Sequence, residues 1–234
     1  MTTRGAFLGA GTATLAAASA LAGTPATAFA ASGPSPFDFP AIAAALARPA
    51  THRQVIGTAK VADGDVLHYA LNTLNAYDFD YGEPGVTHVA AVCYGSGVAL
   101  LVDDAAWAKY KIASILQRRG DAVSRPGSAT ANPFLAATSS LDPHDAPSAP
   151  HGFYHDGSLT ALAKRGASFF ACNNALTGLA NAIALTYSIS SDPVEVVLAD
   201  LRRHLVPGAL LVPAGVAAVN QAQEAKFTLF LVTA

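Results

Sequence analysis

The chain has 234 residues, of which 52% are hydrophobic and 13% are charged, and its formal net charge is -2 at pH 7. These proportions allow a large buried core and exclude general disorder. The small negative charge, with no basic cluster larger than a pair of arginines, argues against nucleic acid as a partner. Two cysteines are too few for a disulfide framework, so packing has to hold the fold together.

The first thirty residues have the order of an export signal. Arg4 is followed by an uncharged Ala/Gly/Leu stretch and then by small residues around Ala28 and Ala30, which is the order that precedes signal-peptide cleavage. We therefore predict a signal peptide over 1–30 and an exported protein, periplasmic or extracellular, that is free of the membrane after cleavage. The start resembles a twin-arginine signal with Gly5 in place of the second arginine, so the export route stays open. The alternative, an uncleaved anchor, needs about 20 strongly apolar residues, which this stretch of small residues does not supply.

Residues 31–50 contain four prolines and are typical of a leader or linker with one short helix at 41–46. The pattern changes at Thr51, where we place the start of the domain. Residues 52–61 predict a strand. Residues 64–79 predict a helix, whose apolar face holds Leu67, Leu71 and Leu74.

Two further elements precede a long irregular segment. Residues 87–95 are an apolar, β-rich run bounded by glycines, which predicts a buried strand. Residues 103–120 begin with two aspartates and end in Arg-Arg-Gly, which predicts one helix. Residues 120–157 then hold five prolines among many Ser, Asp and Ala residues. An insertion of this length is typical of a lid, a binding loop or a disordered segment.

Regular structure resumes after the insertion. One helix is expected to start with Asp192 as N-cap, Pro193 in the first turn and Glu195 completing a capping box. Strand and helix patterns alternate through the rest of the chain, with strands at 167–173, 208–215 and 227–233 and helices at 158–166, 174–189 and 216–226. This alternation, with near-continuous apolar strands, predicts a single α/β domain over 51–234 whose mostly parallel sheet is covered by helices on both faces.

The stretch "ASFFACNNALTGLANAI" places Cys172 where a strand gives way to a helix. Ligands of open parallel sheets bind beyond the carboxyl ends of the strands, and backbone N–H groups at a helix start stabilise a thiolate. A thiolate there can attack sulfane sulfur or a disulfide, and the same donors would stabilise a persulfide. The alternative is a buried cysteine that acts as a small hydrophobic residue.

Three stretches resemble the DsrE/DsrF-like family, which includes sulfur-relay subunits of the TusD type: "FFACNNAL", "LVPGALLVPAGVAAVNQAQEAKFTLF" and, in its exported branch, "HRQVIGTAKVADGDVLHYALNTLNAYDFDYGEPGVTHVAAVCYGSGV". The resemblance covers most of 51–234 and rests on the order of the motifs. It implies a three-layer α/β/α fold, association as trimers or hexamers, and Cys172 as the sulfur-carrying position. Asn173 and Asn174 would then orient the sulfur species. The long insertion departs from the compact relay subunits, which puts the transfer of their partners and substrates in doubt.

Cys93 is the second cysteine and lies just before the end of its strand pattern. The simplest interpretation is a core residue. The alternative is a resolving thiol or a disulfide partner for Cys172, which requires the two strands to be neighbours. In an oxidising compartment such a bond would block a carrier thiol unless a reductant restored it.

Two polar groupings are candidates for a binding site. His68, Asn72 and Asn75 share one helix face, so Asn72 and Asn75 either line a site or lie on a solvated surface. In the turn after the second strand, Ser96 and Gly97 could offer donors to an anion such as thiosulfate. The turn lacks the G-x-G-x-x-G pattern of a dinucleotide site.

His144, His151 and His155 lie among aspartates in the insertion. Histidines four residues apart on a helix can ligate zinc or copper, but the prolines of this segment prevent a helix from holding that spacing. A metal site and a plain polar loop are the two alternatives. A Ser/His/Asp hydrolase is poorly supported, because no G-x-S-x-G motif is present.

These features predict an exported DsrE-like protein that binds or carries sulfane sulfur as a persulfide on Cys172, with sulfurtransferase-like activity left open. Its expected partners are a sulfur-containing small molecule or a thiol protein, and no cofactor is expected. The alternative is a non-catalytic oligomeric module that binds a small molecule or a metal on the same fold, because a fold alone does not establish an activity.

Overall fold

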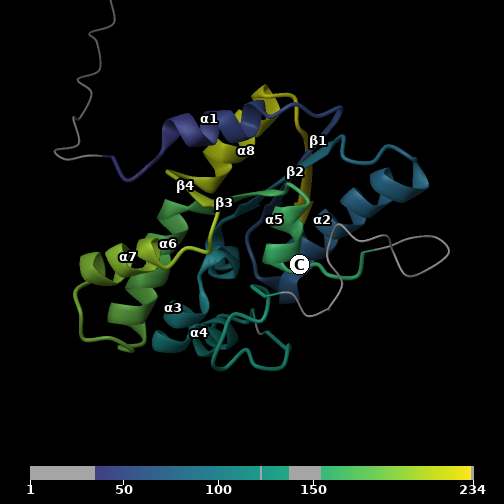
Figure 1. The fold of residues 1–234 in the computed structure, drawn as a ribbon. Helices are drawn as coiled ribbons and strands as arrows, with labels where there is room; N and C mark the ends of the chain where they lie inside the picture. The colour runs from purple at the N-terminus through teal and green to yellow at the C-terminus, as the bar shows by residue number, and fades with distance from the viewer. Residues whose placement is uncertain (1–34, 122, 137–153, 233–234) are drawn as a thin grey trace, which may run out of the picture. The chain divides into compact units, whose positions relative to one another are not determined.

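A single sheet of five parallel strands forms the centre of the domain (Figure 1). In the computed structural model, the described residues are 35–121, 123–136 and 154–232. The strand order is β4-β3-β2-β1-β5, and every neighbouring pair is parallel. The strands are β1 (His52–Thr58), β2 (Thr87–Cys93), β3 (Ser168–Cys172), β4 (Ala209–Val212) and β5 (Thr228–Val232).

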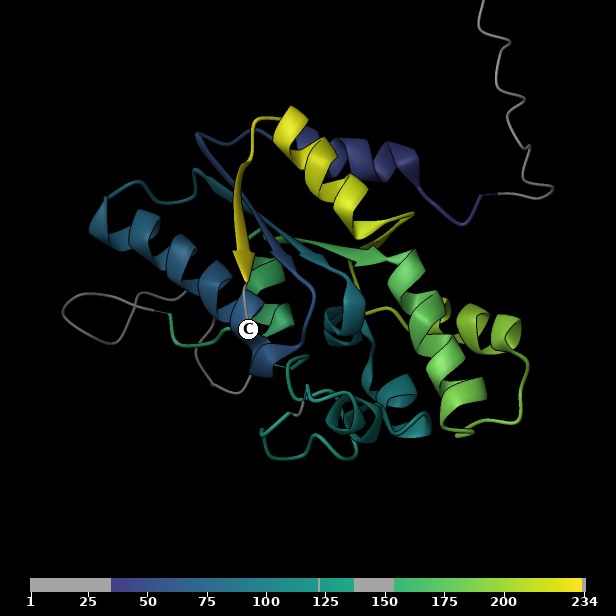
Figure 2. The ribbon, with the colours of Figure 1, turned by 180° about the vertical axis from the view of Figure 1, so that it is seen from behind.

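Helices cover both faces of the sheet, which confirms the predicted three-layer α/β/α fold. The chain steps in one direction from β1 to β4, so right-handed crossovers place the intervening helices on one face. The step from β4 to β5 runs in the opposite direction, and α8 (Gly215–Glu224) therefore lies on the other face beside α1 (Phe39–Ala47) (Figures 1 and 2). We call the two sides the α2 face and the α8 face. The α2 face carries α2 (Asp65–Asn75), α3 (Asp104–Lys109), α4 (Ile112–Arg118), α5 (Leu159–Lys164), α6 (Asn173–Asn181) and α7 (Val194–Arg203).

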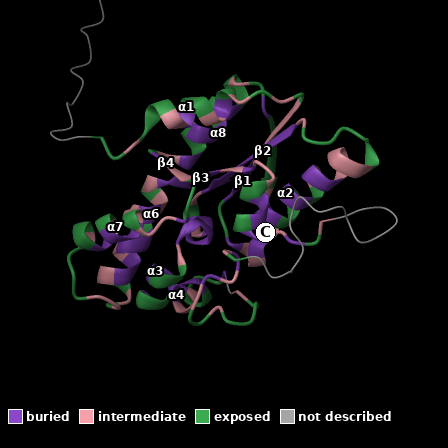
Figure 3. Ribbon diagram, viewed as in Figure 1, coloured by how far each residue is buried: buried purple, intermediate pink, exposed green. Residues whose placement is uncertain are grey.

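The core follows the pleat of the strands. Successive strand residues point to opposite faces, so Ile56 and Phe169 belong to the core of the α2 face, and Val55 and Phe170 belong to the core of the α8 face. Every residue of β2 is buried, as expected for a central strand covered on both sides. Figure 3 shows this burial in the central strands and in the helix surfaces that face them.

Helix α1 is part of the packed domain. Ile42 and Leu46 are buried in the same core cluster as Phe170 and Val212. The compact unit accordingly starts at Ser35, ahead of residue 51, where the sequence placed the start of the domain. The apolar side of α1 is too short to give a periodic signal, and its burial depends on contacts with distant strands.

The single helix predicted over 103–120 is wrong, because the segment forms two helices, α3 and α4. Lys111 between them adopts a left-handed conformation (φ 49°). On one continuous helix Ile112 would lie about 140° around the axis from Trp107, yet both side chains are fully buried. The break lets both helices turn their apolar sides to the core.

The described part of the 120–157 insertion is irregular but packed. Asn132 is buried, and its Nδ2 donates to Leu100 O at 2.8 Å and to Val102 O at 2.7 Å. Phe134 is fully buried in the α2-face core. Asn132 and Phe134 therefore hold the described part of the insertion against the segment that follows β2 and against the core. A lid would not require such buried contacts.

The capping box predicted at Asp192 is wrong. The N-cap of α7 is Pro193, with no side-chain cap, and the Asp192 carboxylate instead accepts a hydrogen bond from the Ser190 hydroxyl at 3.1 Å. The helix packs through one apolar side, with Val197 and Leu201 fully buried.

Candidate functional site

Cys172 caps the first turn of α6. Its backbone remains extended (φ -72°, ψ 116°), and the helix begins at Asn173. Its Sγ accepts a hydrogen bond from the Ala175 backbone N–H, with an N···S distance of 3.4 Å. The residue is 5% exposed. The thiol thus lies at the carboxyl edge of the sheet and at the positive end of a helix, an arrangement that stabilises an anionic sulfur.

Asn173, the residue that follows the cysteine, anchors a cation. Asn173 Oδ1 accepts two hydrogen bonds from Arg202 of α7, from Nε at 3.0 Å and from Nη2 at 2.7 Å. Asn173 is half-buried and Asn174 is exposed. Sequence reasoning did not assign Arg202 to the site, because its place beside Asn173 depends on the packing of α7 against α6. The only local signal was an arginine pair at the end of an amphipathic helix.

Cys93 lies in different surroundings. It ends β2 in the core of the α2 face, and its partner in β3 is Ala171. Cys172 follows Ala171 directly, so strand alternation turns the two cysteine side chains to opposite sides, and both are free thiols. Cys93 is fully buried, and this burial raises the pKa of its thiol to about 12. These observations favour a core residue over a resolving thiol.

The turn that contains Ser96 and Gly97 packs against the loop after β1. A Cβ at Gly95 (φ 53°) would lie 2.4 Å from Ala59 O, so glycine is required there. The Gly97 N–H donates to Ala59 O at 3.2 Å, and the Ser96 hydroxyl donates to Asp121 Oδ2 at 2.6 Å. Because both donors are engaged and a carboxylate lies against them, the anion site suggested for Ser96 and Gly97 is not formed.

Asn72 and Asn75 line a pocket that does not include Cys172. Asn75 Nδ2 donates to Tyr154 O at 2.9 Å, and its Oδ1 accepts from Arg165 Nη1 at 2.8 Å. Arg165 precedes β3 and Cys172 ends it, so roughly 13 Å of strand separates the two positions. Asn75 therefore lies at the amino edge of the sheet and is not part of the Cys172 site. The pocket measures about 370 Å³ and is lined by His68, Leu71, Asn72, Asn75, Tyr154 and His155.

Of the three histidines of the insertion, His155 is the one that the structure describes. His155 borders the pocket beside Asn72, whereas His144 and His151 lie outside the described residues. Within the described ranges, no group of three or more His, Cys, Asp or Glu side chains is placed to hold a metal ion. The metal hypothesis thus depends on residues that the structure does not describe.

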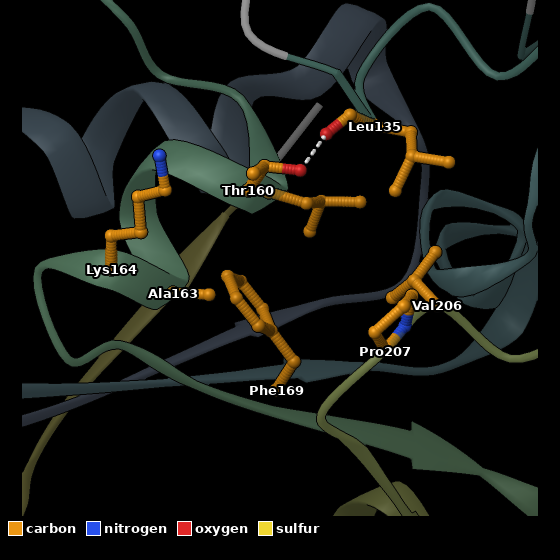
Figure 4. Close-up of a pocket in the computed structure, with 8 residues that line it drawn as sticks. Leu135, Thr160, Ala163, Lys164, Phe169, Val206 and Pro207 are labelled. Atoms are coloured by element: carbon orange, nitrogen blue, oxygen red, sulfur yellow. Dashed lines mark hydrogen bonds between the residues drawn. The ribbon is translucent and has the colours of Figure 1, made fainter. Parts of the chain in front are cut away.

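A larger apolar pocket opens between α5 and the start of β4 (Figure 4). Its volume is about 440 Å³. The Thr160 hydroxyl donates to Leu135 O at 2.7 Å, so its polar group is satisfied within the wall. The remaining lining is apolar except for Lys164, and the set is Leu135, Leu159, Ala163, Phe169, Val206 and Pro207. A pocket of this size and character suits a small apolar molecule.

No family model, curated protein or solved structure matches this chain. The resemblance to the DsrE/DsrF-like family therefore stays a prediction. Among the helices in the described parts of the chain, none has the length and apolar content needed to cross a membrane. The functional argument accordingly rests on the geometry around Cys172 and on the pockets.

Proposed function

We propose that this protein is an exported carrier of sulfane sulfur, held as a persulfide on Cys172. The observation that carries the proposal is the position of the sulfur at the N-cap of α6, where the Ala175 N–H donates to Sγ. The same donor would stabilise the terminal sulfur of a persulfide, which is an anion at neutral pH. The resemblance of "FFACNNAL" to the DsrE/DsrF-like family supports this assignment.

The chemistry needs only a thiolate and a sulfur donor. The Cys172 thiolate attacks the outer sulfur of thiosulfate, the sulfur–sulfur bond of the donor breaks, and sulfite leaves with the bonding electron pair. The persulfide then passes its outer sulfur to an acceptor thiolate and regenerates the Cys172 thiolate. Arg202 is held by Asn173, the residue after Cys172, and its positive charge would attract an anionic donor to this end of the sheet. Because Cys172 is only 5% exposed, a small donor fits the site better than a bulky one.

Intact mass spectrometry tests the proposal. The protein is incubated with thiosulfate or inorganic polysulfide, with and without a later reductant. We expect a mass gain of one sulfur atom that the reductant removes. Cys172→Ser should abolish the gain and Cys93→Ser, the matched control, should retain it. No adduct in the wild type, or an unchanged adduct in Cys172→Ser, would overturn the proposal.

The proposal includes self-association, as the family resemblance implies. Strand β5 is an edge of the sheet, and it exposes Leu229, Phe230 and Leu231. Exposed apolar edge strands are sites of pairing between chains. Light scattering should give a mass above that of one chain, and Leu231→Lys should lower it. A monomeric wild type would remove this part of the proposal and leave the thiol chemistry untouched.

A second candidate is a binding module for a small apolar molecule, favoured by the 440 Å³ pocket in Figure 4. Ala163 lines the pocket and is exposed at its mouth. Ala163→Phe should fill the space and abolish the uptake of an apolar fluorescent dye without unfolding the protein. Equal dye binding by the variant and the wild type would exclude this pocket as the site.

A further inference from the structure

A small polar pocket lies at the amino edge of the sheet, far from Cys172. It measures about 200 Å³ and is formed by the first residues of β1, β2 and β5 together with α2 and the turn after it. The strand register sets His52 beside Thr87 and Gln54 beside Thr228. All four positions lie an even number of residues from a residue of their own strand that packs in the α2-face core (Ile56, Val89 or Val232), so their side chains lie on that face.

The hydrogen bonds of the lining leave donors unused. Thr73 Oγ1 donates to Gln54 Oε1 at 2.7 Å, which leaves the Gln54 amide nitrogen without a partner among the described residues. Thr87 is 7% exposed, and its hydroxyl oxygen is a buried polar atom with no hydrogen-bond partner in the described structure. A buried hydroxyl in this state is normally satisfied by a bound ligand or an ordered water.

The charged residues of the lining are positive. Lys226 is exposed, makes no ion pair with the described residues, and precedes β5 in a left-handed conformation (φ 69°). Arg53 donates to two backbone carbonyl oxygens rather than to an acid. The Glu83 carboxylate bonds His52 Nε2 at 2.7 Å, while the His52 ring stacks on Tyr77. None of the residues that line the pocket is acidic.

From these observations we propose that the pocket binds a compact oxyanion of the sulfate or phosphate class, free or as the terminal group of a small molecule. Its oxygens would accept hydrogen bonds from Thr87 and Gln54 and pair with the Lys226 ammonium. The volume accommodates a tetrahedral anion with a few waters or a short substituent, and it is below the usual range for larger ligands. Because sulfate and phosphate carry no transferable sulfur, this site is independent of the thiol chemistry at Cys172.

Titration calorimetry on the full chain tests the inference, with inorganic sulfate, inorganic phosphate and glycerol phosphate as separate titrants at low ionic strength. We expect saturable binding of at least one of them. Tighter binding of glycerol phosphate would identify a substituted anion, and equal or weaker binding would identify the free ion. Lys226→Gln and Thr87→Val should each weaken binding about tenfold, the usual scale for a lost bond to a charged group.

Two controls keep the result specific. Lys111→Gln removes another exposed lysine with a positive φ that is not part of this pocket, and it should leave the affinity unchanged. Thr87→Val removes an unsatisfied hydroxyl while keeping the side-chain shape, so it should not lower the melting temperature. The absence of saturable binding in the wild type would overturn the inference. Equal affinities in the wild type, Lys226→Gln and Thr87→Val would also overturn it.

Discussion

The carboxyl edge and the amino edge of the sheet differ in the polar groups that hold them together. At the carboxyl edge, backbone groups are held by a few side chains: Asp121 accepts from the N–H groups of Val61 and Ala62 at 2.7 and 2.9 Å and from Ser96. At the amino edge, charged side chains meet one another, as in the Arg165–Asp78 ion pair at 2.8 Å. Buried His88 and the polar pocket beside Thr87 lie at the same edge.

This difference separates two kinds of chemistry. At the carboxyl edge Cys93 is fully buried and the polar groups around Ser96 and Asp121 bond one another, which leaves Cys172 as the candidate reactive atom. The amino edge retains unused donors and positive charge, which suits the binding of an anion. Each edge can therefore be changed while the other is left intact, and the following experiments use that independence.

The largest expected effect is on thiol reactivity within the carboxyl edge. With a pKa of about 12, only about one Cys93 thiol in 10⁴ is ionised at pH 8, and the thiolate is the species that reacts. Iodoacetamide at pH 8 should therefore label Cys172 and leave Cys93 unlabelled until denaturant is added. Peptide mass mapping distinguishes the two sites. If neither thiol reacts in the folded protein, the binding of a small apolar molecule becomes better supported than the carriage of sulfur.

Arg165→Met should cause the largest loss of stability at the amino edge. The Arg165 side chain is 3% exposed and bonds both Asp78 and Asn75. Removing one partner of a buried ion pair leaves the other uncompensated, which costs about 3 to 4 kcal/mol. Urea unfolding measures this, and adding Asp78→Asn should recover part of it. Sulfur uptake by Cys172 should be unchanged while the variant is folded, and a loss of uptake would show that the edges are coupled.

His88 should make stability depend on pH. Its pKa is lowered from 6.5 to about 4 by burial and by the charges of Arg48 and Arg53. Between these values the unfolded chain binds a proton that the folded chain does not, so stability is full above pH 6.5 and falls as the pH drops toward 4. The loss should reach about 2 to 3 kcal/mol. Urea midpoints of wild type and His88→Phe, compared at pH 7 and pH 4.5, should show a smaller drop for the variant, and equal drops would assign the effect to carboxylates.

The smallest effect concerns the cap at Cys172. Cys172→Ala removes the acceptor for the Ala175 N–H, whereas Cys172→Ser keeps one and introduces a preferred N-cap residue. The alanine variant should be less stable than the serine variant by about 1 kcal/mol. Denaturation of the two variants side by side measures the difference. Equal stabilities would mean that the sulfur does not cap α6.

Local patterns were enough to predict most elements from the sequence. The buried run of β2, the Leu67, Leu71 and Leu74 face of α2, and the strand-to-helix change at Cys172 all depend on residues within one or two turns of each other. The same short-range signals predicted a parallel sheet between helix layers. They failed at Lys111, where the demand to bury both Trp107 and Ile112 overrides a helical pattern.

What only the tertiary structure decided is which distant residues share an edge. The sequence by itself determined the alternation of strands and helices and the place of Cys172 at a strand end. It offered Asn75 and Ser96 as candidates for a binding site, but Asn75 lies at the amino edge and Ser96 is bonded to Asp121. It also missed Arg202 and the pocket formed where β1, β2 and β5 begin. Strand order and helix packing bring these residues together across long stretches of chain, and no local periodicity encodes such contacts.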